Sequence, residues 1–202
     1  NLTGQLYAYE QQLQQTTPTV NSVESTSWKV LPYWENGELV INSTGAGAGQ
    51  YIAWRYSPIS NVINITIHVI SYPSRGSEPG IVFYSPTVGD QSNDGNGGFY
   101  ALLVTFHCGD IFYHSPTSGF TKLYCSLPQP NPNYPFTMSV IFTENSAGNV
   151  TVSTVYINST AYTVNFNTPF PWSQIGYVGI RGNLDNIFYV SYFGVSPAPY
   201  GG

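Results

Sequence analysis

The sequence carries very little charge. Only 7% of its 202 residues are Asp, Glu, Lys or Arg, against roughly 25% in a typical soluble protein. The formal net charge is -5, with five basic side chains, which are too few to neutralise a phosphate backbone. We therefore expect no nucleic-acid partner. Because only ten carboxylates can be protonated, little positive charge builds up at low pH. This favours a harsh, acidic extracellular setting, and a simple compositional bias of strand-rich proteins is the alternative.

Long apolar runs are also absent. No stretch of about 18 apolar residues occurs, so we expect no transmembrane segment and no long hydrophobic assembly helix. The chain begins with Asn1 rather than Met, and we expect this end to be left by cleavage of a signal peptide. These two features predict an extracellular protein.

The common catalytic motifs are missing. No Gly-x-Ser-x-Gly elbow, His-Glu-x-x-His pair or phosphate-binding loop occurs. A glycosidase needs two facing carboxylates, and the ten acidic residues offer no carboxylate in the middle of an aromatic strand. Glu35 and Glu38 flank a turn, where solvated surface carboxylates are the commoner outcome. The sequence therefore predicts a protein that is not an enzyme.

Cysteine is scarce as well. Cys108 and Cys125 enclose a segment with the pattern of a β-hairpin. In a secreted chain this arrangement predicts one disulfide across neighbouring strands, which would restrict the unfolded loop and stabilise the fold by about 3 kcal/mol. A metal site with His107 and His114 is the alternative, but zinc sites usually show closer cysteine spacing.

One loop resembles the start of a calcium-binding loop. Asp90, Asp94 and Asn96 supply alternating oxygen ligands, but Ala101 stands where such a loop needs its bidentate Glu. A glycine-rich hairpin connection is the better interpretation, so we expect no metal and no cofactor.

Aromatic and neutral polar residues are abundant, and apolar residues recur at every second position of the expected strands. In 62–71 the residues Ile63, Ile65, Ile67 and Val69 share one face, as in a half-buried antiparallel strand. Further strands are expected at 27–33, 37–42, 50–56, 80–85, 98–107, 110–114, 120–126, 135–143, 148–157, 160–165, 174–181 and 186–195. Turn sequences separate them and no helix is indicated. The fold class is therefore all-β, an antiparallel, jelly-roll-like β-sandwich.

The last third of the chain has a pattern of strands that is typical of a known fold. The strands at 149–158, 161–164, 175–181 and 188–195 resemble the closing strands of concanavalin-like and laminin-G-like sandwiches. This resemblance implies a carbohydrate-binding module or a glycoside hydrolase as one hypothesis. Trp28, Trp34, Trp54 and Trp172 could stack on sugars, although most Trp side chains in such a sandwich pack in the core.

Five Asn-x-Ser/Thr sequences predict N-glycosylation. Asn64 is expected on the polar face of its strand, and Asn42 and Asn158 where strands meet turns. Glycans there would hydrate a surface with few charges and oppose aggregation of sheet edges. The remaining predicted acceptors are Asn1 and Asn149.

The N-terminus differs from the rest of the chain. Residues 1–25 are expected to form a strand arm on a polar tether, and residues 26–202 a single β-sandwich domain. On the arm, Leu2, Gly4, Leu6 and Ala8 share one face of a short alternating strand. This strand could complete its own sheet, or it could insert into a groove of the next subunit, where those side chains would fill successive pockets. The second case gives a heterologous contact and an open filament.

A secreted, charge-poor sandwich with glycosylation sequences and an N-terminal strand arm resembles the thread filament subunits of thermoacidophilic archaea. That resemblance implies head-to-tail assembly of identical, N-glycosylated subunits by donor-strand exchange. It also implies a structural role at the cell surface, in adhesion or cell-cell contact.

Overall fold

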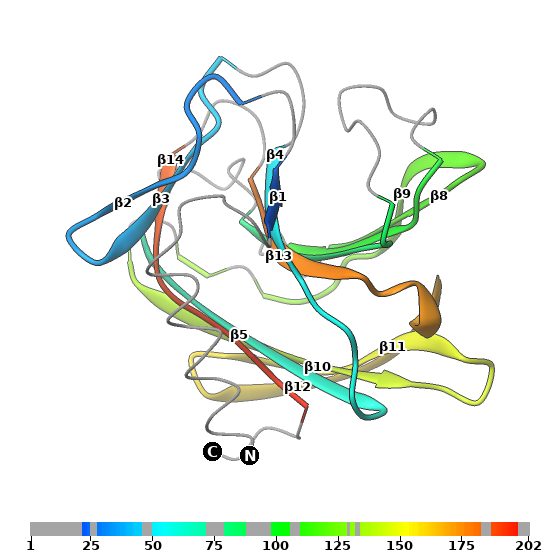
Figure 1. Ribbon diagram of the computed structural model, residues 1–202. Helices are drawn as coiled ribbons and strands as arrows, with labels where there is room; N and C mark the ends of the chain where they lie inside the picture. Colours follow the sequence, from blue (N-terminus) through cyan, green and yellow to red (C-terminus); the bar gives the residue numbers. More distant parts are fainter. Residues whose placement is uncertain are drawn as a thin grey trace.

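The computed structural model is a sandwich of two antiparallel β-sheets (Figure 1). It describes residues 22–24, 28–45, 50–71, 79–87, 98–105, 110–128, 130–131, 134–182 and 187–197. The predicted donor-strand residues Leu2, Gly4, Leu6 and Ala8 lie outside the described residues.

Sheet A has the strand order β1-β4-β13-β6-β7-β8-β9. Its strands are β1 (Ser22–Glu24), β4 (Gln50–Arg55), β6 (Gly80–Tyr84), β7 (Ala101–Thr105), β8 (Ile111–Ser115), β9 (Ser118–Tyr124) and β13 (Tyr177–Gly182). Sheet B has the order β12-β11-β10-β5-β14-β3-β2. Its strands are β2 (Tyr33–Glu35), β3 (Glu38–Asn42), β5 (Val62–Ser71), β10 (Phe136–Glu144), β11 (Asn149–Ile157), β12 (Thr160–Pro171) and β14 (Ile187–Ser196). A short 3₁₀ helix, η2 (Trp172–Gln174), follows β12.

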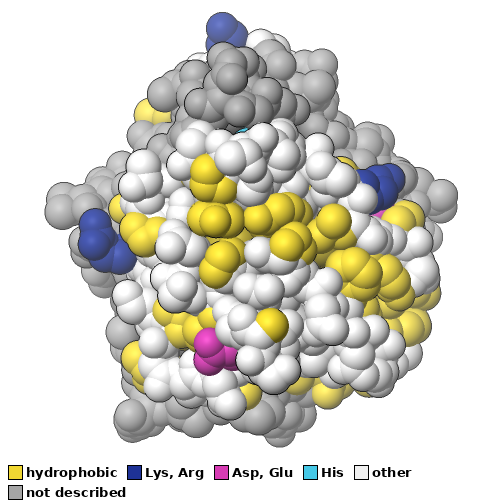
Figure 2. All heavy atoms as spheres, turned by 90° about the vertical axis from the view of Figure 1, so that its right-hand side faces the viewer, with side chains coloured by type: hydrophobic (Ala, Val, Ile, Leu, Met, Phe, Trp, Pro, Cys, Tyr) yellow, Lys and Arg dark blue, Asp and Glu magenta, His cyan; other side chains and the backbone are white. Residues whose placement is uncertain are grey.

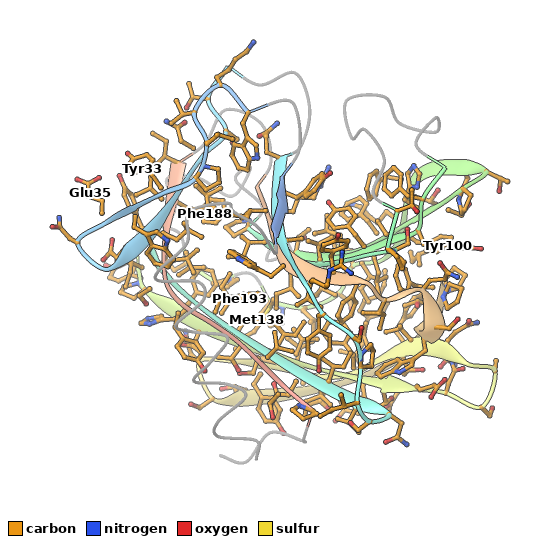
Figure 3. All side chains as sticks on the ribbon, viewed as in Figure 1. Tyr33, Glu35, Tyr100, Met138, Phe188 and Phe193 are labelled. Carbon is orange, nitrogen blue, oxygen red and sulfur yellow. The ribbon has the colours of Figure 1, made fainter. Side chains whose placement is uncertain are left out.

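The main core lies between the two sheets and is built by strict alternation. On β5, the four apolar residues at alternate positions, Ile63 to Val69, are fully buried. Met138, Phe188 and Phe193, from β10 and β14, also lie between the sheets (Figure 3). Since period-two alternation places every second side chain on the same face, the remaining residues of these strands form the outer face of sheet B.

The predicted fold class is confirmed, because both sheets are antiparallel and the described part of the chain contains no α-helix. Strand β5 has the predicted bounds, and the predicted hairpin between the two cysteines is β8 paired with β9. The predicted closing strands correspond to β11, β12, β13 and β14, with differences at the end of β12 and the start of β13.

The structure differs from the predicted strands near several element ends. Residues 28–32 are not a strand, and β2 begins at Tyr33, because Pro32 has no N–H to give to a ladder. Within the predicted strand arm and polar tether, 1–25, Ser22–Glu24 forms β1 and pairs with β4. Strand β12 continues to Pro171, and Gln174 belongs to η2 rather than to the next strand.

A second apolar cluster lies on the outer face of sheet A. Ring contacts join Tyr51 to Tyr84 at 4.4 Å and Tyr84 to Phe99 at 6.2 Å, measured between ring centroids. The cluster is buried although it faces away from the main core, so sheet A is apolar on both faces. Its buried members are Tyr51, Ala53, Val82, Tyr84, Phe99, Ala101, Leu103 and Tyr177.

The edge strands carry features that oppose pairing with other sheets. On β12, Asn165 has a φ of 49°, and the register with β11 shifts at the same point. A bulge of this kind bends an edge strand away from regular pairing. The opposite edge of sheet B, β2, is only three residues long, and β9 at the edge of sheet A carries Lys122.

Few charged side chains interrupt the surface. On the face in Figure 2, backbone atoms and side chains that are neither charged nor hydrophobic cover most of the described surface. Hydrophobic side chains gather in a band, and Lys, Arg and carboxylate groups are isolated. The low charge content of the sequence is thus visible on the folded surface.

Candidate functional site

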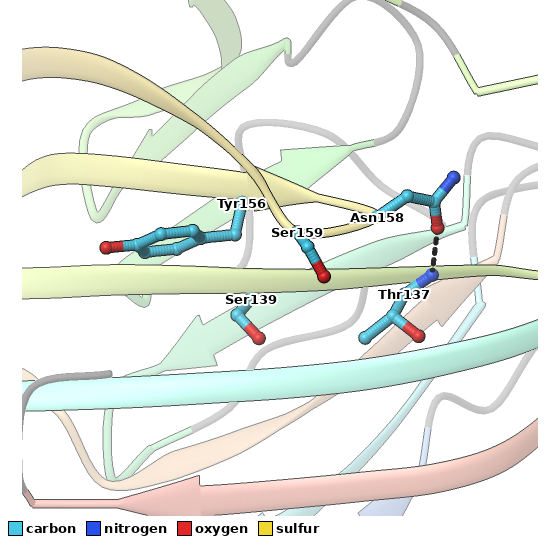
Figure 4. A pocket seen from close by; sticks show the side chains of 5 residues that line it. All are labelled: Thr137, Ser139, Tyr156, Asn158 and Ser159. Carbon is cyan, nitrogen blue, oxygen red and sulfur yellow. Dashed lines mark hydrogen bonds between the residues drawn. The ribbon is translucent and has the colours of Figure 1, made fainter. Parts of the chain in front are cut away.

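A pocket of about 340 Å³ lies at the end of sheet B, beside the β11–β12 hairpin turn (Figure 4). Two of its residues, Thr137 and Ser139, come from β10, and Tyr156 comes from β11. Asn158 and Ser159 form the turn itself. The lining therefore offers hydroxyl groups, one amide and one phenol ring, and no charged group among the described residues.

The hairpin turn is held in place by two hydrogen bonds to one residue. Asn158 and Ser159 have φ values of 48° and 71°, the left-handed pair that a tight two-residue hairpin requires and that Asn tolerates better than most residues. The backbone N–H of Asn158 donates to the carbonyl oxygen of Thr137 at 2.9 Å. The backbone N–H of Thr137 donates to Asn158 Oδ1, also at 2.9 Å (Figure 4). The Asn158 side chain thereby extends the β10–β11 ladder by one step and fixes the pocket rim.

The pocket floor is part of the outer face of sheet B. Ser139 is opposite Thr66 on β5, and their hydroxyl oxygens are 2.6 Å apart. Two residues before Thr66, Asn64 is 8% exposed, and its Oδ1 has no hydrogen-bond partner in the described structure. A buried amide oxygen without a partner is costly, so this face has unused capacity to accept a hydrogen bond.

The outer face of sheet B is almost free of charge. Among the described strands β5, β10, β11, β12 and β14, the one residue of the Asp, Glu, Lys and Arg type is Glu144 at the end of β10. His68 lies on the same face, with its Nδ1 2.8 Å from Ser191 Oγ. This surface suits a neutral ligand that exchanges hydrogen bonds.

The cations of sheet A are used differently. Arg55, Lys122 and Arg181 each lie over an aromatic ring, at 5.7, 5.8 and 5.0 Å from the ring centroids of Tyr177, Phe112 and Phe120. Lys122 Nζ is also 3.3 Å from the buried Asp110 carboxylate. These contacts stabilise the second apolar cluster and its border.

Two tyrosines outside the pocket have a shifted pKa. Burial raises the pKa of Tyr56 to about 12. Burial, and then the neighbouring Tyr100, raise the pKa of Tyr113. Both phenols therefore keep their proton near neutral pH.

The four tryptophans do not form the predicted sugar platforms. Trp54 and Trp172 are buried in the main core, while Trp28 and Trp34 are partly buried and pack against it. Trp28 Nε1 also donates to the Tyr51 carbonyl oxygen at 3.1 Å. The Trp side chains therefore pack in or against the core, because large rings gain more free energy from burial than from stacking at the surface.

The carboxylates Glu35 and Glu38 are opposite each other across the β2–β3 turn. Glu35 is exposed, at the margin of the sandwich (Figure 3). This is the surface position expected for turn carboxylates, and the pocket lies elsewhere, between β10 and the β11–β12 turn.

The metal alternative for the cysteine segment gains no support. His114 is buried, its ring stacks on Phe99 at 4.0 Å, and its Nδ1 is 2.9 Å from the Phe99 carbonyl oxygen. The described residues contain no cluster of three metal-binding side chains. Cys125 directly follows β9. Its predicted partner Cys108 lies outside the described residues, as do His107 and the loop 90–96, so the predicted pairing stays a prediction.

The predicted glycosylation positions differ in their surroundings. Asn158 is exposed in its turn, and Asn42 ends β3 with Oδ1 accepting the Thr44 N–H at 3.0 Å. Asn149 is half-buried at the start of β11, and Asn64 is on the predicted face but buried. Glycan attachment at Asn64 would require that side chain to become exposed. Asn1 lies outside the described residues, and all five positions remain predictions.

Sequence reasoning did not single out the pocket residues apart from Asn158. The period-two pattern of 135–143 does assign Thr137 and Ser139 to the polar face. What the sequence alone lacks is the register that sets Ser139 opposite both Thr66 and Tyr156. Register between strands depends on turns and bulges, and β11 contains a shift that the pattern does not reveal.

The chain is similar in sequence to a viral protein. It is 65% identical, over 205 residues, to the protein described as putative transmembrane protein ORF1334 of Acidianus two-tailed virus. The match covers 99% of this chain and 15% of that protein, so the chain spans a small part of this relative. In the described residues, no helix is long and apolar enough to cross a membrane. No protein-family model matches the chain.

Solved structures resemble the chain in fold. The potassium-bound Emp46p carbohydrate recognition domain has a TM-score of 0.55 at 14% identity, covering 98% of this chain and 97% of that one. The Man3GlcNAc-bound exoplasmic domain of VIP36 has a TM-score of 0.57 at 10% identity, covering 90% and 85%. The carbohydrate binding module CBM66 from Bacillus subtilis has a TM-score of 0.54 at 6% identity, covering 88% and 96%. At these identities the likeness shows the fold alone, and the chain has the β-sandwich fold of these lectin-like domains.

Proposed function

We propose that this chain is a carbohydrate-binding domain that holds a neutral saccharide in the pocket at the β11–β12 turn. The observation that carries the proposal is the composition of the pocket, which combines Tyr156 with hydroxyl and amide groups and has no charged group among its described residues. Sugars present hydroxyls that both donate and accept, together with apolar ring faces that pack on aromatic rings.

The geometry of the pocket fits this chemistry. The hydroxyl groups of Thr137, Ser139 and Ser159 can each donate and accept, and Asn158 is held by its two bonds to Thr137. A ligand therefore meets a rim that is already ordered, which lowers the entropy cost of binding. The volume of about 340 Å³ is at the lower end of small-molecule sites, enough for one sugar residue.

The fold comparisons support the same class of ligand. The Emp46p and VIP36 domains and CBM66 are carbohydrate-recognition structures by their descriptions. A shared sandwich does not transfer a function by itself, and the argument for this chain rests on its own pocket.

A binding role fits the described residues better than hydrolysis. Glycosidases place two carboxylates on either side of the scissile bond, and the described lining of the pocket contains none. A sialidase also shares the fold, over 17% of its own length, so the fold alone does not decide between the two. We accordingly propose a domain that is not an enzyme.

The filament hypothesis rests on residues that the structure does not describe. Its donor strand, its identical head-to-tail partners and its extracellular placement all remain predictions. Saccharide binding is compatible with adhesion, the role expected for such a filament. A domain of this kind within a larger surface protein would serve attachment in the same way.

The experiment is a glycan array followed by calorimetry on the best neutral glycan. We expect Tyr156→Ala to weaken binding at least about tenfold, equivalent to ~1.4 kcal/mol, without loss of folding. The matched control is Tyr134→Ala, since Tyr134 is 63% exposed and lies outside the pocket. Absence of binding to every neutral glycan, or equal effects of the two substitutions, would contradict the proposal.

A further inference from the structure

The pocket continues into a row of side chains that crosses four adjacent strands of sheet B. Gly194 on β14 is opposite Thr66 on β5, Thr66 is opposite Ser139 on β10, and Ser139 is opposite Tyr156 on β11. All four positions are on the outer face, because their neighbours Val195, Ile65, Val140 and Val155 are buried in the main core. We call these positions, with the ring of Tyr192, the cross-strand row.

The ring of Tyr192 occupies the place above Gly194. A Cβ atom built on Gly194 would come within 2.7 Å of Tyr192 Cζ and 2.8 Å of its Cε1. The glycine therefore leaves room for this ring to lie on the sheet, and a half-buried aromatic surface stands at the β14 end of the row. Tyr156, also half-buried, stands at the β11 end.

Hydrogen-bonding groups lie between the two rings. The hydroxyls of Thr66 and Ser139 are bonded to each other at 2.6 Å. Ser139 is buried, whereas Thr66 is half-buried and its hydroxyl can still engage a further partner. One step along β5 on the same face is Asn64, whose buried Oδ1 has no partner in the described structure. Two aromatic rings are thus separated by hydroxyl and amide groups. A chain of sugars could pack its ring faces on the aromatic rings and bond its hydroxyls to the groups between them.

The length of the row indicates the size of the ligand. Tyr192 and Tyr156 are separated by three strand steps of ~4.8 Å each, or roughly 14 Å in total. A pyranose ring is about as wide as one strand spacing, so the row accommodates roughly three sugar residues. Beyond Tyr156 the next position is the exposed Ala161 on the edge strand β12, which leaves this end of the row open.

We propose that the ligand of this domain is a linear neutral oligosaccharide that lies across β14, β5, β10 and β11, with Tyr192 and Tyr156 as its two ring contacts. This inference rests on the proposed function and extends it from one sugar to a chain. The neutrality follows from the five strands around the row, whose described residues include one carboxylate, Glu144, and no Lys or Arg.

The test is calorimetry with neutral hexose oligosaccharides of increasing length, from a monosaccharide to a hexasaccharide, of the linkage selected on the array. We expect affinity to rise until about three residues and then level off. Tyr192→Ala should lower affinity for the trisaccharide about tenfold and leave the monosaccharide affinity unchanged. Tyr156→Ala should weaken both. Tyr192→Phe keeps the ring and should retain most of the trisaccharide affinity.

Tyr33→Ala is the control, because Tyr33 is on the same outer face but on the edge strand β2, outside the row. The inference fails, with the proposed function intact, if the monosaccharide binds as tightly as the trisaccharide, or if Tyr192→Ala has no more effect than Tyr33→Ala. Absence of binding at any length overturns the proposed function itself. Circular dichroism of each variant identifies any loss caused by unfolding.

Discussion

The outer faces of the two sheets have opposite characters. On sheet A, Tyr51, Tyr84 and Phe99 are almost completely buried in the second apolar cluster. On sheet B, Thr66, His68 and Tyr156 are half-buried and polar. Both faces belong to one sandwich and share one main core. The difference shows that sheet A is buried on both faces, while the outer face of sheet B keeps partly exposed polar side chains among the described residues.

The difference originates in the sequence of each strand. Strands β6 and β7 are continuously buried along their length, the pattern of a strand covered on both faces. In β5, by contrast, Asn64, Thr66 and His68 alternate with fully buried Ile residues. Among the described strands, the basic side chains follow the same division. The cations Arg55, Lys122 and Arg181 are on strands of sheet A, above aromatic rings.

The largest effect should come from the second apolar cluster. Phe99 is 1% exposed, stacks on His114 at 4.0 Å and lies 6.2 Å from the ring of Tyr84. We expect Phe99→Ala to lower the free energy of unfolding by about 3–5 kcal/mol, because it leaves a cavity. Urea unfolding measures this. A loss below about 1 kcal/mol would mean that the outer face of sheet A is a surface and not a core.

Substitutions at the border of the second apolar cluster should lower the free energy of unfolding by an intermediate amount. Lys122 is half-exposed, but its partner Asp110 has a side chain only 1% exposed. Lys122→Ala removes this ion pair from a buried carboxylate, so we expect a loss of about 1–3 kcal/mol after allowing for solvent screening of the lysine. Arg55→Ala, which removes an exposed cation from the Tyr177 ring, should cost only about 0.5–1 kcal/mol. Equal losses in urea unfolding would show that the buried carboxylate does not depend on Lys122.

A small change in stability, close to that of Arg55→Ala, should come from the outer face of sheet B. Thr66→Val keeps the shape of the side chain and removes its 2.6 Å hydrogen bond to Ser139, so we expect a loss of about 1 kcal/mol. Saccharide affinity should fall by a comparable amount, about five-fold. Calorimetry and urea unfolding on the same variant check both values. Unchanged affinity would remove the middle of the cross-strand row from the site.

Much of the fold could be predicted from the sequence. The alternation of Ile63 to Val69 gave β5 its bounds, and the turn at Asn158 and Ser159 marked the β11–β12 hairpin. Both signals are local, since one needs only a period of two and the other only the backbone preference of Asn. Pro32, which cannot pair in a ladder, likewise marks why the strand expected at 27–33 is absent.

The candidate site could not be predicted in the same way. The polar residues Thr66, Ser139 and Tyr156 are far apart in the sequence and meet only through the register of three strands. The tryptophans were the conspicuous sugar-binding candidates, yet their size places them in or against the core. Whether a side chain lies at the surface depends on whether its sheet is covered on one face or on both. The coverage of a sheet depends on the whole sandwich and not on one strand.

Amide chemical shifts recorded during titration with the selected neutral trisaccharide locate its binding surface. We expect the shifts to cluster on β5, β10, β11, β14 and the turn at Asn158 and Ser159. The amides of β4, β6 and β13, on sheet A, should stay unchanged. Shifts centred on sheet A, or on the edge strand β2 near Glu35, would contradict the assignment of the outer face of sheet B as the saccharide-binding surface.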